Sequence, residues 1–174
     1  ALVEEYYDKY TILLEGRDEK EFRKHVAAQA GIEIGFERFL EEKNYQAIVT
    51  HFGDLGSLKQ LPGLAIQRLM EKGYGFGGEG ILQAHMLEVC PTIADGPISI
   101  KCQPLSMGDR EDPARLVFTS KTGPAIATSL IDLGDRFRLI INDVECKKPE
   151  KPMPKLPVAT AFWTPQPNLP IGAE

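Results

Sequence analysis

The chain has 174 residues, of which 43% are hydrophobic and 26% are charged, and its formal net charge is −5. These values are those of a globular protein, long enough for one domain or two small ones. Lysines and arginines are scattered among the acidic residues, which argues against a nucleic-acid-binding face, and no apolar run approaches the roughly 18 residues of a membrane span.

The three cysteines, Cys90, Cys102 and Cys146, are widely spaced and include no CxxC pair. This pattern predicts neither a disulfide framework nor a zinc site, so we expect reduced thiols in a cytoplasmic protein. The chain begins at Ala1, within polar helix-like sequence and without an initiator Met. We therefore expect it to be part of a longer protein.

Helical patterns dominate the first part of the chain. Apolar residues recur at intervals of three and four from Leu2 to Tyr10, as on the buried face of a helix. Asp18 and Glu21 have the spacing of a capping box, which predicts a helix from there to about Lys43. Glycines in that helix, Gly31 and Gly35, suggest that another element packs closely against it.

A short buried strand is expected at Tyr45–Thr50, followed by a helix at Pro62–Lys72 that Gly73 ends. Helix, strand and helix in this order are typical of an α/β layer. Twelve of the thirteen prolines lie beyond residue 81. We therefore place a domain boundary near Gly80, with residues 1–80 as part of an α/β domain and residues 81–174 as part of a β domain.

Six short alternating runs in the second part predict strands separated by turns: Leu82–Val89, Ile98–Cys102, Ala114–Thr119, Ile126–Ile131, Arg136–Val144 and Val158–Trp163. Their spacing, with no helical pattern between them, predicts an antiparallel sheet or barrel. The stretch from Lys147 to Pro157 holds four prolines and is expected to be a solvated connector.

Gly75–Gly80 formally matches the GxGxxG pattern of dinucleotide-binding proteins. That reading needs a strand before the glycines and a helix after them. Here a helix pattern precedes them and strand-like residues follow, so we expect a flexible joint and not a nucleotide site.

Glu88 is the most suggestive candidate for chemistry. It stands in a run of apolar residues, where an ionised carboxylate is costly unless a cation or hydrogen-bond donors compensate. It is therefore a candidate metal ligand or general base; the alternative is that its face of the sheet is solvated and the residue simply faces water. His85, three residues earlier, would point to the opposite face of a strand.

The two other histidines give weaker signals. His25 lies among charged residues of the predicted helix and is expected at the surface, whereas His51 follows the Tyr45–Thr50 strand and is better placed for a cleft. No second candidate ligand lies near His51 in the sequence, and His51 stays unassigned.

Longer strings resemble the L-arabinose isomerase family, in its order and spacing and over nearly the whole chain. They are LKQLPGLAIQRLMEKGYGFGGEG (58–80), AHMLEVCPTIA (84–94), REDPARLVF (110–118), GPAIATSLIDLGDRFRLI (123–140) and MPKLPVA (153–159). The resemblance implies the end of a Rossmann-like central α/β domain followed by an antiparallel, β-barrel-like C-terminal domain.

The resemblance also implies a reaction, the interconversion of L-arabinose and L-ribulose with D-galactose to D-tagatose as a side activity. Protons would move through a cis-enediol between two glutamates, with Mn²⁺ chelating two sugar oxygens. The resemblance further implies a homo-oligomer, with a hexamer as the expected form, in the cytoplasm and with no nucleic-acid or membrane partner.

Carried over by position, Glu88 matches one of the two metal-binding catalytic glutamates, and Phe76 and Ile126 match residues that line the sugar site. Three departures stand beside these matches. A few dozen family residues, with the second glutamate, are absent after Gly80. Gln103 stands where a metal-binding histidine is expected. The chain also stops before the segment that carries the last histidine.

We therefore expect the intact protein to be an isomerase, and the 174 residues taken alone to be inactive. Gln103 motivates an alternative, a non-catalytic relative that binds sugar or serves in assembly. A chance resemblance of an unrelated sheet domain is the third possibility.

Overall fold

A computed structural model describes residues 1–51, 54–78, 90–103, 110–148 and 161–162. These residues form two compact units, 1–119 and 120–174, and each is described by itself. The first unit contains parts of both sequence halves. The boundary near Gly80 stays a prediction, because that residue and the predicted strand Leu82–Val89 lie outside the described residues.

Two helices open the first unit, α1 (Leu2–Lys9) and α2 (Glu19–Lys43). Asp18 caps α2 as the sequence predicts, since its carboxylate accepts a hydrogen bond from the Glu21 N–H at 2.9 Å. Within the described residues, no close packing is found at the α2 glycines. A Cβ added at Gly31 or Gly35 would meet no atom of the described residues within 4 Å.

A parallel strand pair follows α2. β2 (Ala47–Thr50) and β3 (Gly75–Gly78) lie side by side, joined through α3 (Gly63–Glu71). This βαβ unit confirms the predicted α/β layer. Two expectations are corrected: the first strand is mostly exposed, with only Thr50 buried, and the first four residues of the expected flexible joint form β3.

The second sheet of this unit joins residues from both ends of its sequence. β1 (Thr11–Ile12) pairs in parallel with β4 (Ser99–Cys102), which pairs antiparallel with β5 (Ala114–Val117). The 3₁₀ turn η1 (Pro91–Ile93) precedes β4. The sheet is therefore mixed, in contrast to the purely antiparallel arrangement expected for the second half of the chain.

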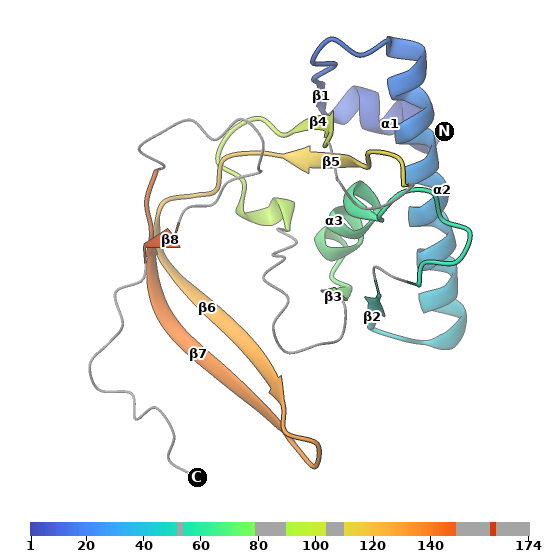
Figure 1. Cartoon of the computed structure of the whole chain (residues 1–174). Coiled ribbons are helices and arrows are strands. Elements are labelled where there is room, and N and C mark those ends of the chain that lie inside the picture. The colour runs from blue at the N-terminus through green and yellow to red at the C-terminus, as the bar shows by residue number, and fades with distance from the viewer. Residues whose placement is uncertain (52–53, 79–89, 104–109, 149–160, 163–174) are drawn as a thin grey trace. The chain divides into compact units, whose positions relative to one another are not determined.

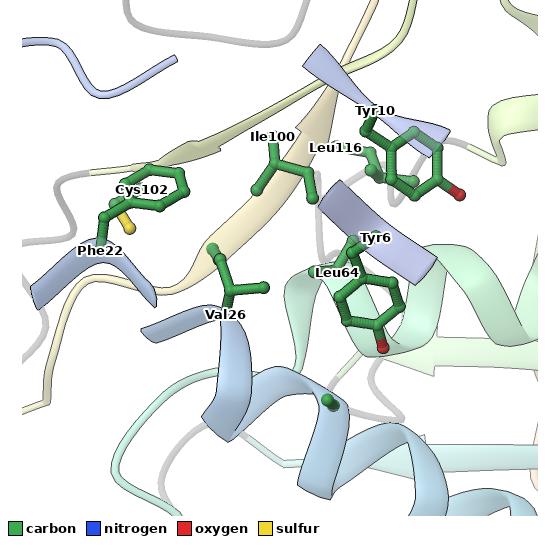
Figure 2. Packing of buried hydrophobic residues seen from close by; sticks show 10 residues of the cluster. Tyr6, Tyr10, Phe22, Val26, Leu64, Ile100, Cys102 and Leu116 are labelled. Carbon is green, nitrogen blue, oxygen red and sulfur yellow. The ribbon is translucent and has the colours of Figure 1, made fainter. Parts of the chain in front are cut away.

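The main core lies between this sheet, α1, α2 and α3 (Figure 2). Its buried members are Tyr6, Tyr10, Phe22, Val26, Ala30, Leu64, Ile100, Cys102, Ala114 and Leu116. The predicted apolar face of the first helix thus meets the alternate residues of β4 and β5 that point inward. A smaller cluster of Leu40, Ile66 and Leu69 lies between α2 and α3, which run beside each other in Figure 1.

The second unit is built on a long hairpin, β6 (Gly123–Asp132) and β7 (Phe137–Cys146), with β8 (Ala161–Phe162) beside the end of β7. Its three strands are antiparallel, as the sequence predicts. The predicted turn contains Gly134 at φ +90°, which glycine adopts without steric cost. Most of the predicted connector after Lys147 lies outside the described residues.

The three sheets are open over the described ranges. A mixed α/β architecture is therefore established, whereas barrel closure and a Rossmann-like layer stay predictions. Among the described residues, no helix combines the length and apolar character that a membrane crossing requires.

Candidate functional site

The residues predicted for the sugar site fall in different parts of the structure. Glu88 and His85 lie outside the described residues. Phe76, in β3 of the first unit, is half-buried and packs against the cluster of Leu40, Ile66 and Leu69. Ile126, in β6 of the second unit, is 65% exposed. Their roles in binding sugar stay predictions.

Gln103 is the predicted site residue whose surroundings are best defined. It directly follows β4, where its N–H extends the ladder by donating to the Pro113 carbonyl at 3.0 Å. Its side-chain oxygen Oε1 accepts a hydrogen bond from Nη1 of Arg115 at 3.2 Å. Both residues are buried, with 5% and 7% of their surface exposed. The amide oxygen is thus held by a cation from the neighbouring strand.

A second cation lies on the same face of this sheet. In the β4–β5 register Lys101 is directly opposite Arg115, and side chains in register point to one face. Lys101 is also buried, and its amine is 3.4 Å from a carboxylate oxygen of Glu15. Lys101, Gln103 and Arg115 therefore lie together on one buried polar face that carries two cations. The sequence did not predict this grouping, because Arg115 lies on a different strand from the other two.

This arrangement does not suit a divalent metal. Two like unit charges 4 Å apart repel by about 4 kcal/mol at the effective dielectric constant near a protein surface, and a divalent ion doubles the effect. Among the described residues, no three His, Cys, Asp or Glu side chains gather closely enough to hold a metal ion. In this geometry Oε1 of Gln103 is hydrogen-bonded to Arg115, and the described residues by themselves do not complete a Mn²⁺ site.

The segment before β5 is tied down by several contacts that the sequence did not predict. Nη1 of Arg110 donates to the Leu58 carbonyl at 2.5 Å, and the Glu111 N–H donates to the Lys59 carbonyl at 2.9 Å. Asp112 forms an ion pair with Arg17. These contacts fix the start of β5, and with it the strand that carries Arg115.

His25 contributes to the same attachment, and its expected surface position is wrong. The residue is 8% exposed, and its Nδ1 lies 2.9 Å from the Asp112 carbonyl oxygen and 3.1 Å from Nε2 of Gln60. It faces the segment before β5, which is distant in sequence and which helix periodicity could not place. His51 is exposed at the end of β2 and stays unassigned.

A buried ionic network lies on the other side of the first unit, around Glu33. This carboxylate of α2 is fully buried and contacts Arg68 and Lys72 as well as the Tyr6 hydroxyl, which donates at 2.5 Å. Burial, together with this hydrogen bond, raises the pKa of Tyr6 well above its usual value. The network joins α1, α2 and α3, and it needs no ligand to be satisfied.

A cavity of about 400 Å³ opens near the ends of α2 and α3. Its lining residues are mostly polar: Leu40, Glu41, Asn44, Tyr45, Gln46, Lys72, Gly73 and Tyr74. None of the predicted site residues that the structure describes lines it, and the helix ends there present carbonyl groups and not amide donors. The cavity is therefore separate from the face that carries Gln103.

Known proteins resemble the chain closely. Residues 42–174 match the family described as L-arabinose isomerase C-terminal domain. A protein named L-arabinose isomerase from Geobacillus stearothermophilus is 47% identical over 209 residues, which cover 99% of this chain and 42% of the relative. Another so named, from Salmonella enteritidis PT4, is 44% identical over 214 residues, which cover 100% of this chain and 43% of the relative.

The chain thus spans less than half the length of the relatives it matches. The matched span of 209 residues in the first relative is at least 35 longer than the 174 residues of this chain. Relatives therefore hold a few dozen residues inside the matched region that have no counterpart here. That number agrees with the segment expected, but absent, after Gly80.

Proposed function

Because this chain belongs to the L-arabinose isomerase family, we propose that it is part of an aldose–ketose isomerase that converts L-arabinose to L-ribulose. The observation that carries the proposal is the identity of 47% to a protein of that name over 99% of the chain. The match excludes a chance resemblance of an unrelated sheet domain. Conversion of D-galactose to D-tagatose is proposed as a side activity.

The chemistry is a proton shift between the first two carbons of the sugar, through a cis-enediol. One carboxylate takes a proton from carbon, while another transfers the proton of the neighbouring hydroxyl. We propose Glu88 as one of these two carboxylates, with Phe76 and Ile126 lining the sugar site. The second carboxylate has no counterpart in this chain, so the 174 residues alone should be inactive.

Mn²⁺ is proposed as the cofactor of the intact protein, where it would stabilise negative charge that develops on the sugar oxygens. The support is the family resemblance and the carboxylate of Glu88, a ligand type that suits this ion. Gln103 does not fit as a further ligand, because its Oε1 accepts from Arg115. Two further ligands of the family have no counterpart in this chain.

The direct test is to incubate the full-length protein with L-arabinose and Mn²⁺ and to measure ketose. A Glu88→Gln variant should lose turnover and bind Mn²⁺ more weakly, with its unfolding midpoint unchanged. Retained turnover in that variant would show that the site is misplaced. Absence of ketose in the unsubstituted protein, with metal bound, would overturn the proposed activity.

A non-catalytic relative that binds sugar or serves in assembly is the second candidate, and one contact favours it. The buried pair of Gln103 and Arg115 replaces an expected metal ligand with a cation. Binding of L-arabinose without any ketose product would support this candidate.

We further propose a homo-oligomer, with six subunits as the family suggests, in the cytoplasm. All three cysteines are free thiols, which suits a reducing compartment. Light scattering on the purified protein measures the subunit number, and a monomer would contradict the proposal.

A further inference from the structure

We propose that Gln103 is not a metal ligand in this protein but a positioning residue that holds the guanidinium of Arg115. The inference rests on the proposed function, since it concerns a position where a metal ligand is expected. In this role the amide oxygen of Gln103 accepts a hydrogen bond from Arg115 and thereby orients its guanidinium.

The first support is the place of the pair in the sheet. Gln103 is fixed at the end of β4 by its own backbone hydrogen bond to Pro113, and Arg115 is fixed within β5. With both backbones held, Nη1 of Arg115 reaches Oε1 of Gln103 at 3.2 Å. The contact thus depends on two rigid strands and not on a loop.

The second support is the packing around Arg115. A Cβ placed on Gly63, at the start of α3, would lie 2.6 Å from Cγ of Arg115 and 3.2 Å from the Ala114 carbonyl oxygen. The side chain therefore crosses the helix at a position where only glycine leaves room. The aliphatic part of the Arg115 side chain is therefore held against α3 at Gly63.

The third support is charge. A metal ion that used Oε1 of Gln103 would share this oxygen with the guanidinium of Arg115. Repulsion between like charges makes a neutral amide with a bound cation a poor site for a second cation. Gln103 should therefore lie beside the metal site of the intact protein without touching the ion.

Mn²⁺ titration of the full-length protein, read from the electron paramagnetic resonance signal of free Mn²⁺, tests this role. Gln103→Met removes the amide at nearly constant volume, and Gln103→Asn keeps an amide but withdraws its oxygen. Both should change the Mn²⁺ dissociation constant by less than about twofold, because neither removes a ligand. A loss of affinity of about tenfold or more in either folded variant would overturn the inference.

A gain-of-ligand variant sharpens the same titration. Gln103→His should raise Mn²⁺ affinity only when Arg115 is also replaced, as in Gln103→His with Arg115→Met, because the guanidinium no longer competes. Ser99→His is the matched control, since residue 99 shares that face of β4 but lies away from Arg115. An equal rise with and without the Arg115 substitution would contradict the positioning role.

A double-mutant cycle tests the pair without any metal. Gln103→Met and Arg115→Met should be non-additive, with a coupling of about threefold or more in the unfolding equilibrium constant. Gln103→Met with Lys9→Met, a distant exposed site, is the additive control. Additivity of the Gln103 and Arg115 substitutions would overturn the inference.

The two proposals fail in different ways. If the protein makes no ketose, the isomerase proposal fails while the cycle still reports on Gln103 and Arg115. If it binds no Mn²⁺ at all, the proposed cofactor is wrong, and the double-mutant cycle of Gln103 and Arg115 decides whether the inference is correct. If ketose forms and Gln103→Met releases the metal, the isomerase stands and the positioning role is wrong.

Discussion

Arg68 on α3 donates through Nε to both carboxylate oxygens of Glu33 on α2, at 3.2 and 2.9 Å. The Glu33 carboxylate is fully buried, and Arg68 also reaches the Tyr10 hydroxyl at 3.1 Å and lies 4.9 Å from the centre of the Tyr6 ring. One buried ion pair thereby connects the three helices of the first unit. Removing Glu33 would take its buried carboxylate partner from Arg68 and leave the exposed carboxylate of Glu5 as the ion-pair partner described for that guanidinium.

Glu33→Ala should therefore lower the free energy of unfolding by about 3–5 kcal/mol, the usual cost of breaking a buried pair. Urea denaturation followed by circular dichroism measures it. Glu71→Gln, which removes the exposed pair of Lys9 and Glu71, is the control and should cost less than about 1 kcal/mol. Equal losses of unfolding free energy in the two variants would show that burial does not make the Glu33 contacts more stabilising than the exposed pair.

Gly31→Ala should stabilise the protein by about 0.5–1 kcal/mol, because alanine lowers the conformational entropy of the unfolded chain and favours α2. The space for the added methyl group is open among the described residues. Gly73→Ala is the opposite case, since Gly73 has φ +100°, where a side chain costs about 1–2 kcal/mol. Thermal unfolding of both variants should show shifts of opposite sign, and a loss of stability in Gly31→Ala would mean that another element covers α2.

The ring of His25 should carry its proton on Nδ1. Gln29 is oriented by the backbone, since its Oε1 accepts from the Ala65 N–H and its Nε2 donates to the Leu61 carbonyl. Its Nε2 also donates to Oε1 of Gln60, which turns Nε2 of Gln60 toward His25 and Glu111. The amide group of Gln60 can donate its hydrogen bond to Glu111 instead of to His25. The Asp112 carbonyl oxygen, 2.9 Å from Nδ1, can only accept, so the contact places the proton on Nδ1.

Nitrogen-15 shifts of the imidazole ring measure this tautomer directly. We expect a protonated Nδ1 in His25 at neutral pH, with exposed His51 as the internal reference. A bare Nδ1 would show that Gln60 donates to the ring and that the Asp112 carbonyl has another partner.

Cys102 should resist thiol reagents in the folded protein. Burial raises the pKa of its thiol to about 11 from an ordinary value of 9.0, so the reactive thiolate is scarce at pH 8. Cys90 and Cys146 are half-buried, and an Ellman titration should find these two thiols before denaturation and all three after it. The folded protein keeps the thiol proton up to about pH 11, whereas the unfolded chain loses it from about pH 9. The free energy of unfolding should therefore be unaffected by this group below pH 9 and fall as the pH rises toward 11.

Rapid native labelling of Cys102 at pH 8 would contradict this assignment. A Cys102→Ser variant is the control, since it should leave the native count unchanged and lower the denatured count by one.

Local signals were enough for most elements of the fold. The capping box at Asp18, the glycine at position 73 and the alternation in β6 and β7 each depend on neighbours within a few residues, so the helices and the hairpin were predicted near their observed bounds. Predictions failed where a distant partner decides. The parallel pairing of β1 with β4 joins residues 11 and 99, and no local pattern encodes it.

The candidate site shows the same division. The order and spacing of its strings identified the family, and the resemblance drew attention to Gln103 as a position where a histidine is expected. What that glutamine does was not visible, because its partner Arg115 lies on the adjacent strand and reaches it only through the β4–β5 register.

The sequence by itself therefore determined the family, the helices and the hairpin. The tertiary structure alone decided that His25 is buried, that Glu33 and Arg68 form the ionic centre of the helices, and that Gln103 binds a guanidinium. The physical reason is that helix caps and turns act over a few residues, whereas burial and charge pairing depend on which distant segments are packed together.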